Sequence, residues 1–194
     1  ANCLVGSEMC IRDSSGTWGA DGTTYFWDVT DPGQIRKIDS IQVDARTVND
    51  VKVSEDGKIS IISREGASSR KNGIVIIDTT NPYDVNIISE YTTNLTGGVH
   101  NVFIYDDHVY ALSNGERFYV INIEDPSNPY EVGMFEIGEK GQAIHDVWVE
   151  DGIAYTSNWK HGVYIIDVGN GVAGGSPSNP VVTVSYTHLT LPTS

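Results

Sequence analysis

The stretch GIVIIDTTNP, Gly73–Pro82, decides the fold, because the chain repeats it three more times in altered form. The related phrases are TYFWDVTDP ending at Pro32, RFYVINIEDPSNP ending at Pro129, and GVYIIDVGNG ending at Gly171. Each phrase joins an apolar run to an anchoring acid or amide, and the anchors lie 44 to 50 residues apart, at Asp28, Asp78, Asn122 and Asp167. A period of this length is typical of repeat architectures.

A second phrase precedes three of these four, as TVNDVKVSEDG from Thr47, GVHNVFIYDDH from Gly98 and AIHDVWVEDG from Ala143. Each unit then divides into four short runs rich in Val, Ile, Tyr and Phe, with turn residues between them. In the third unit the runs are residues 99–106, 108–114, 117–124 and 130–138. No stretch sustains a helical period, so no helices are expected. Four strands in each repeat predict an all-β chain made of β-propeller blades.

The phrases GIVIID, FYVINI and VYIIDV, followed by Asn-Pro or Asp-Pro turns, resemble the LVIVD repeat of bacterial and archaeal propeller proteins. The resemblance covers nearly all of residues 15–182, and it implies a propeller of a kind often found at the cell surface. We expect about three and a half four-stranded antiparallel blades: a partial blade at 15–46 and full blades at 47–97, 98–142 and 143–183. A closed propeller needs at least four blades, so we expect the natural protein to continue on both sides.

Both ends of the chain depart from the repeat. Met9–Ser14, MCIRDS, and Thr183–His188, TVSYTH, can be encoded by one DNA sequence and its inverted complement. This pattern resembles the translated mosaic end of a transposase sequencing adaptor, so residues 1–14 and 184–194 are expected to be adaptor-derived. The alternative is that the last stretch is a real strand, since Val, Tyr and Thr suit one. Without the two ends no cysteine remains, which excludes disulfide and thiolate chemistry.

The charge balance restricts the partners. The chain of 194 residues carries a net charge of -14 and only 12 Lys and Arg, which argues against nucleic acid and anionic membranes. No apolar run approaches the roughly 18 to 20 residues of a membrane span. We therefore expect a protein or polysaccharide ligand. The family resemblance and the missing thiols favour an extracellular, cell-surface or periplasmic location.

Polar pairs stand where the first strand of each blade is expected to begin. The first strands line the channel of a propeller, and the loops between second and third strands return to the same face. Ligand binding is therefore predicted there, for Asn49, Asp50, His100, Asn101, His145, Asp146, Trp159, Lys160 and His161. The same loops add Arg64, Glu65, Glu116, Arg117 and Asn158 to this face.

Three interpretations of the His and Asp residues stay open. His100, His145 and Asp146 could hold a divalent metal, since imidazole and carboxylate suit one. The side chains could instead hydrogen-bond loop backbone and join one blade to the next. His145 and Asp146 could also act as general acid and base. No nucleophile elbow, P-loop, GxGxxG or HExxH motif supports catalysis. We expect a non-catalytic binding module with no cofactor, unless His100, His145 and Asp146 bind a divalent metal. The alternative is an extracellular propeller hydrolase or lyase.

Aromatic residues divide into two groups. Six lie within strand runs and are expected to pack between blades: Tyr25, Trp27, Tyr119, Trp148, Tyr155 and Tyr164. Trp159 falls in a loop, beside Lys160 and His161, where it is expected to contact a sugar ring or a protein.

Overall fold

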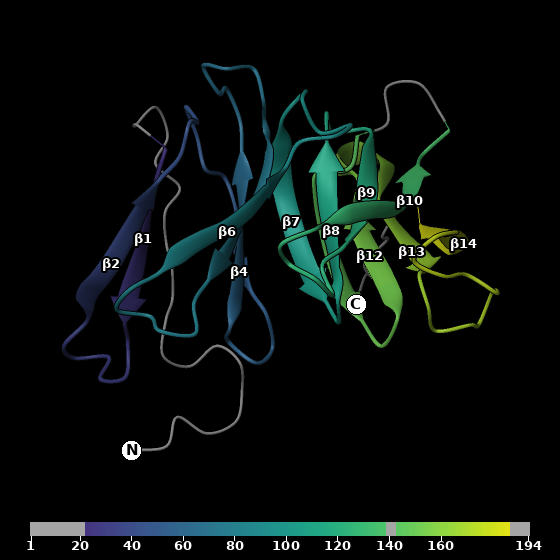
Figure 1. Cartoon of the computed structure of the whole chain (residues 1–194). Helices are drawn as coiled ribbons and strands as arrows, with labels where there is room; N and C mark the ends of the chain where they lie inside the picture. The colour runs from purple at the N-terminus through teal and green to yellow at the C-terminus, as the bar shows by residue number, and fades with distance from the viewer. Residues whose placement is uncertain (1–21, 139–142, 187–194) are drawn as a thin grey trace.

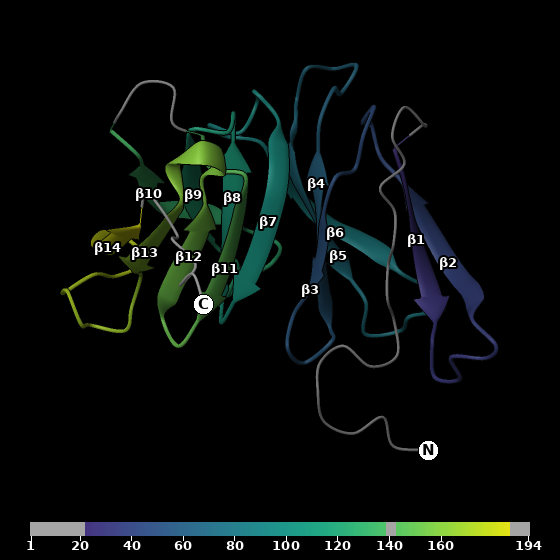
Figure 2. The same cartoon turned by 180° about the vertical axis from the view of Figure 1, so that it is seen from behind.

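The computed structural model of the chain describes residues 22–138 and 143–186. In this part the strands form one two-stranded and three four-stranded antiparallel sheets. Figures 1 and 2 show that the four sheets lie side by side and follow one another in the order of the chain. The prediction of an all-β partial propeller with about three and a half blades is confirmed.

The strand order within each full sheet follows the chain, from the inner to the outer strand. The partial first blade contains β1 (Thr23–Asp28) and β2 (Arg36–Gln42). The second contains β3 (Val51–Val53), β4 (Ile59–Arg64), β5 (Gly73–Asp78) and β6 (Asn86–Tyr91). The third contains β7 (Val99–Tyr105), β8 (His108–Ser113), β9 (Arg117–Asn122) and β10 (Tyr130–Glu136). The fourth contains β11 (Asp146–Glu150), β12 (Ile153–Ser157), the 3₁₀ turn η1 (Trp159–His161), β13 (Val163–Asp167) and β14 (Val181–Tyr186).

The middle strands are apolar throughout because both faces of a central blade are covered. In β8, Val109 and Ala111 join the apolar cluster shared with the second blade. The alternating residues Tyr110 and Leu112 join the cluster shared with the fourth blade. Side chains alternate between faces along a strand, so burial of both faces requires an unbroken apolar run. This is the physical origin of the GIVIID-like phrases.

The anchoring acid or amide after each run closes the turn that follows it. Its side-chain oxygen accepts a hydrogen bond from the backbone N–H two residues later, the usual Asx turn. The four pairs are Asp28 with Thr30 (3.0 Å), Asp78 with Thr80 (2.8 Å), Asn122 with Glu124 (3.1 Å) and Asp167 with Gly169 (3.0 Å). The repeated phrase therefore encodes a buried strand together with its turn.

The predicted boundary between the last blade and adaptor-derived sequence falls inside β14. Val184 pairs with Ile165, and Tyr186 pairs with Val163. Strand pairing uses backbone groups that every residue except proline carries, so it does not depend on where these residues come from. The adaptor origin of residues 184–194 stays a prediction, and residues 1–14 and 187–194 lie outside the described part.

One property of the described segments bears on the expected partners. Among residues 22–138 and 143–186, no helix has the length and apolar character that a bilayer crossing requires.

Candidate ligand-binding face

The predicted site residues gather on one face of the sheets, which we call the strand-start face. It is the upper end in Figures 1 and 2, where β3, β7 and β11 begin and where the loops β4–β5, β8–β9 and β12–β13 return. The strand β7 contacts both β3 and β11, so the starts of the three inner strands lie beside one another.

One row of side chains crosses this face from the second to the fourth blade. The Nδ2 atom of Asn49 lies 3.2 Å from Nδ1 of His100, and Oε1 of Glu65 lies 3.3 Å from the same nitrogen. The His100 and His145 rings meet edge to face with centroids 5.2 Å apart. His145 in turn meets the ring of Trp159 at 4.5 Å. Asn49, His100 and His145 hold the same position in successive blades, so the repeat builds this row.

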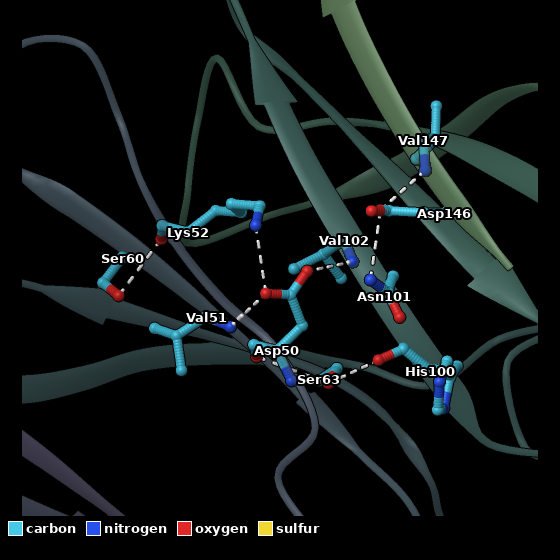
Figure 3. Close-up of polar contacts among 10 residues, drawn as sticks. All are labelled: Asp50, Val51, Lys52, Ser60, Ser63, His100, Asn101, Val102, Asp146 and Val147. Carbon is cyan, nitrogen blue, oxygen red and sulfur yellow. Dashed lines mark hydrogen bonds and ion pairs between the residues drawn. The ribbon is translucent and has the colours of Figure 1, made fainter. Parts of the chain in front are cut away.

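The next residue of each blade forms a second, deeper set of contacts (Figure 3). The carboxylate of Asp50 accepts hydrogen bonds from Val51 N (2.9 Å) and Lys52 Nζ (3.1 Å). Its other oxygen accepts one from Val102 N of the third blade at 3.0 Å. The side chain of Asp50 is only 15% exposed. Of the three interpretations of these residues, this geometry matches the link between blades.

The third and fourth blades are joined by a similar but more exposed contact. Asn101 Nδ2 donates to Asp146 Oδ1 at 3.1 Å, and the same oxygen accepts from Val147 N at 2.8 Å. Asp146 is exposed.

Ser63 adds a further link between the second and third blades, because its hydroxyl donates to the carbonyl of His100 at 3.3 Å. Nothing in the sequence pattern distinguished Ser63 from other strand serines, so this contact could only be found in the structure.

The half-buried position of Asp50 leads to a stability prediction. Replacing Asp50 with alanine leaves the amide of Val102 without its acceptor, and should lower the free energy of unfolding by about 2 kcal/mol. The equivalent replacement of the exposed Asp146 should cost less than about 1 kcal/mol. Urea unfolding of both variants measures the difference. Equal losses would contradict the larger contribution expected from the less exposed carboxylate of Asp50.

The predicted metal ligands are only partly brought together. His100 and His145 are neighbours, whereas Asp146 is engaged by Asn101 and by its own strand. Among the residues that the structure describes, no three His, Cys, Asp or Glu side chains form a group that could hold a metal ion.

The loop between β12 and β13 displays one large aromatic side chain. Trp159 is 68% exposed and has a backbone φ of 48°, a conformation that side-chain-bearing residues rarely adopt. Beneath it, the buried Asn158 donates from Nδ2 to the carbonyls of Thr156 (3.0 Å) and Gly162 (3.3 Å). His161 is half-buried, and the side chain of Lys160 lies outside the described part. The turn therefore holds Trp159 outward.

The remaining loop residues and strand aromatics match the predictions only in part. Arg64 is 2% exposed and pairs with Glu90 at 2.9 Å, so it does not contribute to the face. Tyr119 is buried as predicted. Trp148 is 55% exposed, yet its ring meets Phe103 of the third blade with centroids 4.8 Å apart, so it contacts a neighbouring blade as predicted. Tyr155 is 40% exposed, and the prediction that it packs between blades is wrong for this structure. Tyr155 lies on the face of the fourth sheet that no further described sheet covers.

Comparison with known families supports the repeat organisation. The pattern of the LVIVD repeat matches residues 68–93, 96–136 and 141–188. No curated protein matches the chain.

Solved structures share the fold at low sequence identity. A functionally unknown protein from Desulfotomaculum acetoxidans aligns with a TM-score of 0.63 at 13% identity, over 90% of this chain and 61% of its own. A hypothetical selenium-binding protein from Sulfolobus tokodaii gives 0.60 at 13%, over 83% and 45%. The β-propeller domain of Cps50 (Swd1) from Myceliophteria thermophila gives 0.64 at 11%, over 92% and 55%. The chain thus spans less than two thirds of the length of each.

Proposed function

This chain belongs to the LVIVD-repeat family, and we propose that it is a non-catalytic module that binds a polysaccharide or a protein through its strand-start face. The observation that carries the proposal is the outward position of Trp159, which is 68% exposed. Tryptophan is enriched among the residues that dominate binding energy at interfaces.

The surroundings of Trp159 favour a polysaccharide as the first ligand to test. Its ring meets His145 by an edge, and the row continues to His100, Glu65 and Asn49. An aromatic face suits the C–H surface of a sugar ring, while imidazole, carboxylate and amide groups suit its hydroxyls. The row crosses three blades, so it could contact several sugars of one extended chain. The net charge of -14 favours neutral over acidic polymers.

The test is a binding screen of the purified chain against neutral polysaccharides, including xylan, glucan and mannan. Replacing Trp159 with alanine should weaken binding about thirtyfold, as expected for a tryptophan that dominates the binding energy of an interface. Tyr130→Ala is the matched control. Tyr130 is an aromatic residue of similar exposure, 55%, and it lies in the third blade at the end opposite to the strand-start face. Isothermal titration calorimetry of the three proteins gives the dissociation constants.

Other outcomes of this experiment would change the proposed site, ligand or activity. If Tyr130→Ala weakens binding as much as Trp159→Ala, the strand-start face is not the site. If no polysaccharide binds, the ligand proposed for this face is a protein. Release of reducing ends during the titration, abolished by replacing His145 and Asp146, would support the propeller hydrolase or lyase instead.

We place the module at the cell surface, outside the cell or in the periplasm. The family resemblance and the absence of cysteine between residues 15 and 183 support this location. Fractionation of the source cells, with an antibody against residues 22–138, would test it; a purely cytosolic signal would exclude it.

A further inference from the structure

The chain contains three Asn-Gly pairs: Asn72-Gly73, Asn114-Gly115 and Asn170-Gly171. The asparagine of such a pair can deamidate spontaneously, because glycine has no side chain that would hinder attack by its backbone nitrogen. The glycine nitrogen attacks the asparagine side-chain carbonyl and loses its proton, and ammonia leaves. One water molecule then opens the cyclic imide at either carbonyl, which yields aspartate or isoaspartate. The reaction needs a mobile carboxamide and a free glycine N–H.

The pair Asn72-Gly73 is protected by burial. Asn72 is 9% exposed, and both ends of its carboxamide are engaged. Its Oδ1 accepts from Ala67 N at 2.9 Å, and its Nδ2 donates to Thr96 O at 2.8 Å. The carboxamide must lose both bonds before it can turn toward Gly73.

The pair Asn170-Gly171 is exposed but its reacting groups are held. The nucleophile, Gly171 N, donates to Oδ1 of the buried Asp167 at 3.0 Å. The carboxamide of Asn170 donates to the carbonyl of Asp151 at 2.8 Å. A backbone nitrogen whose N–H donates a hydrogen bond to a carboxylate is unavailable for attack until that hydrogen bond breaks.

The pair Asn114-Gly115 is protected neither by burial nor by hydrogen bonds, and its carboxamide packs against Gly97. Asn114 is exposed at the turn between β8 and β9, with φ of 55° at Asn114 and 70° at Gly115. The bonds that hold this turn are long, 3.4 Å from Glu116 N to Ser113 O and 3.4 Å from Asn114 N to Gly98 O. Within the described residues, neither the Asn114 carboxamide nor the Gly115 N–H has a hydrogen-bond partner. We propose that Asn114 is the site of spontaneous deamidation in the folded protein.

The product would alter the strand-start face. The carbonyl of Gly115 accepts the backbone bond from Ile144 N at 2.6 Å, and Ile144 directly precedes His145. Isoaspartate at position 114 inserts a methylene into the backbone one residue before this carbonyl. The carbonyl must then move, and Ile144 loses or lengthens its bond. This consequence stands whether or not the face binds the proposed ligand.

The experiment follows the complete chain at mildly alkaline pH in heavy-oxygen water, with tandem mass spectrometry to place the label at each asparagine. In the folded chain Asn114 should convert about tenfold faster than Asn72 or Asn170, since each of these must first break hydrogen bonds. In guanidinium, where the fold is lost, the three should convert at similar rates. The Asn114→Gln variant should carry no label at this position.

Two results would overturn the proposal. One is a folded chain in which Asn114 converts no faster than Asn72 and Asn170. The other is the same ranking of the three sites in guanidinium as in buffer, because local sequence and not the fold would then set the rates. Hydrogen exchange tests the consequence separately: the amide of Ile144 should exchange faster after conversion, and unchanged exchange would exclude the effect on the face.

Discussion

Replacing Tyr110 with alanine is expected to lower the free energy of unfolding by about 3–5 kcal/mol, the range for removing a large buried aromatic side chain. Tyr110 is 1% exposed and lies in the apolar cluster between the third and fourth blades. Its ring meets Phe118 edge to face with centroids 5.7 Å apart. Burial raises the pKa of its hydroxyl well above the usual value. Alanine would leave a cavity between two blades, so their contact should weaken together with the core.

The chain supplies a matched control for this variant. Tyr155 holds the same position in the fourth blade, one repeat later, but it is 40% exposed. Tyr155→Ala should therefore cost less than about 1 kcal/mol. Urea unfolding of both variants, followed by circular dichroism, measures the difference. Similar losses would contradict the assignment of Tyr110 to a packed interface that Tyr155 lacks.

Asp167 is expected to be the carboxylate whose loss harms the fourth blade most. It is 0% exposed, and its two oxygens accept four backbone N–H groups from the glycine-rich loop after β13. The donors are Gly169 (3.0 Å), Gly171 (3.0 Å), Ala173 (2.7 Å) and Gly175 (3.0 Å). Asp167→Asn replaces one accepting oxygen with a donor and leaves two amides unpaired. The melting temperature should fall on the order of 10 °C.

The pH dependence of this effect has a definite sign. The bonds from Ala173 and the three glycines hold the pKa of Asp167 well below its usual 3.8, although burial opposes them. A depressed pKa in the folded state means that the carboxylate stabilises fully above the unfolded value, and less as pH falls below it. The difference in melting temperature between wild type and Asp167→Asn should therefore shrink below about pH 4.

Asp78→Asn is the control for Asp167→Asn. Asp78 has the same place in the second blade, but its side chain accepts only the Thr80 N–H among the described backbone amides. Its removal should lower the melting temperature much less. A difference between wild type and Asp167→Asn that grows at low pH would contradict the role of the ionised carboxylate.

The sequence predicted the blades well because each blade is built from local rules. A run such as Gly73–Asp78 must be buried on both faces, and the Asp that ends it closes its own turn. Both features operate within a few residues, so they can be recognised without knowing the neighbours. The place of the strand-start pairs follows from the same repeat, because antiparallel strands return the chain to the same face at regular intervals.

The sequence could not assign roles to those pairs. Asp50 and Asp146 have the same position in the repeat, yet Asp50 bonds to the next blade and is mostly buried, whereas Asp146 is exposed. Tyr110 and Tyr155 differ in the same way. Asp167 was identified only as the acid that ends the repeated apolar run. Its hydrogen bonds with four backbone amides depend on the glycine-rich loop that follows β13.

The amino-acid sequence by itself determined the strands, the turns and the number of blades within this chain, since unbroken apolar runs and turn residues act over neighbouring positions. Only the tertiary structure decided which equivalent residues are buried, which contact each other across blades, and how Trp159 is displayed. Whether a residue is buried, and what it contacts in the next blade, depends on the sheet that lies beside it. Equivalent residues of the repeat lie beside different neighbours, so the same residue type can be buried in one blade and exposed in another.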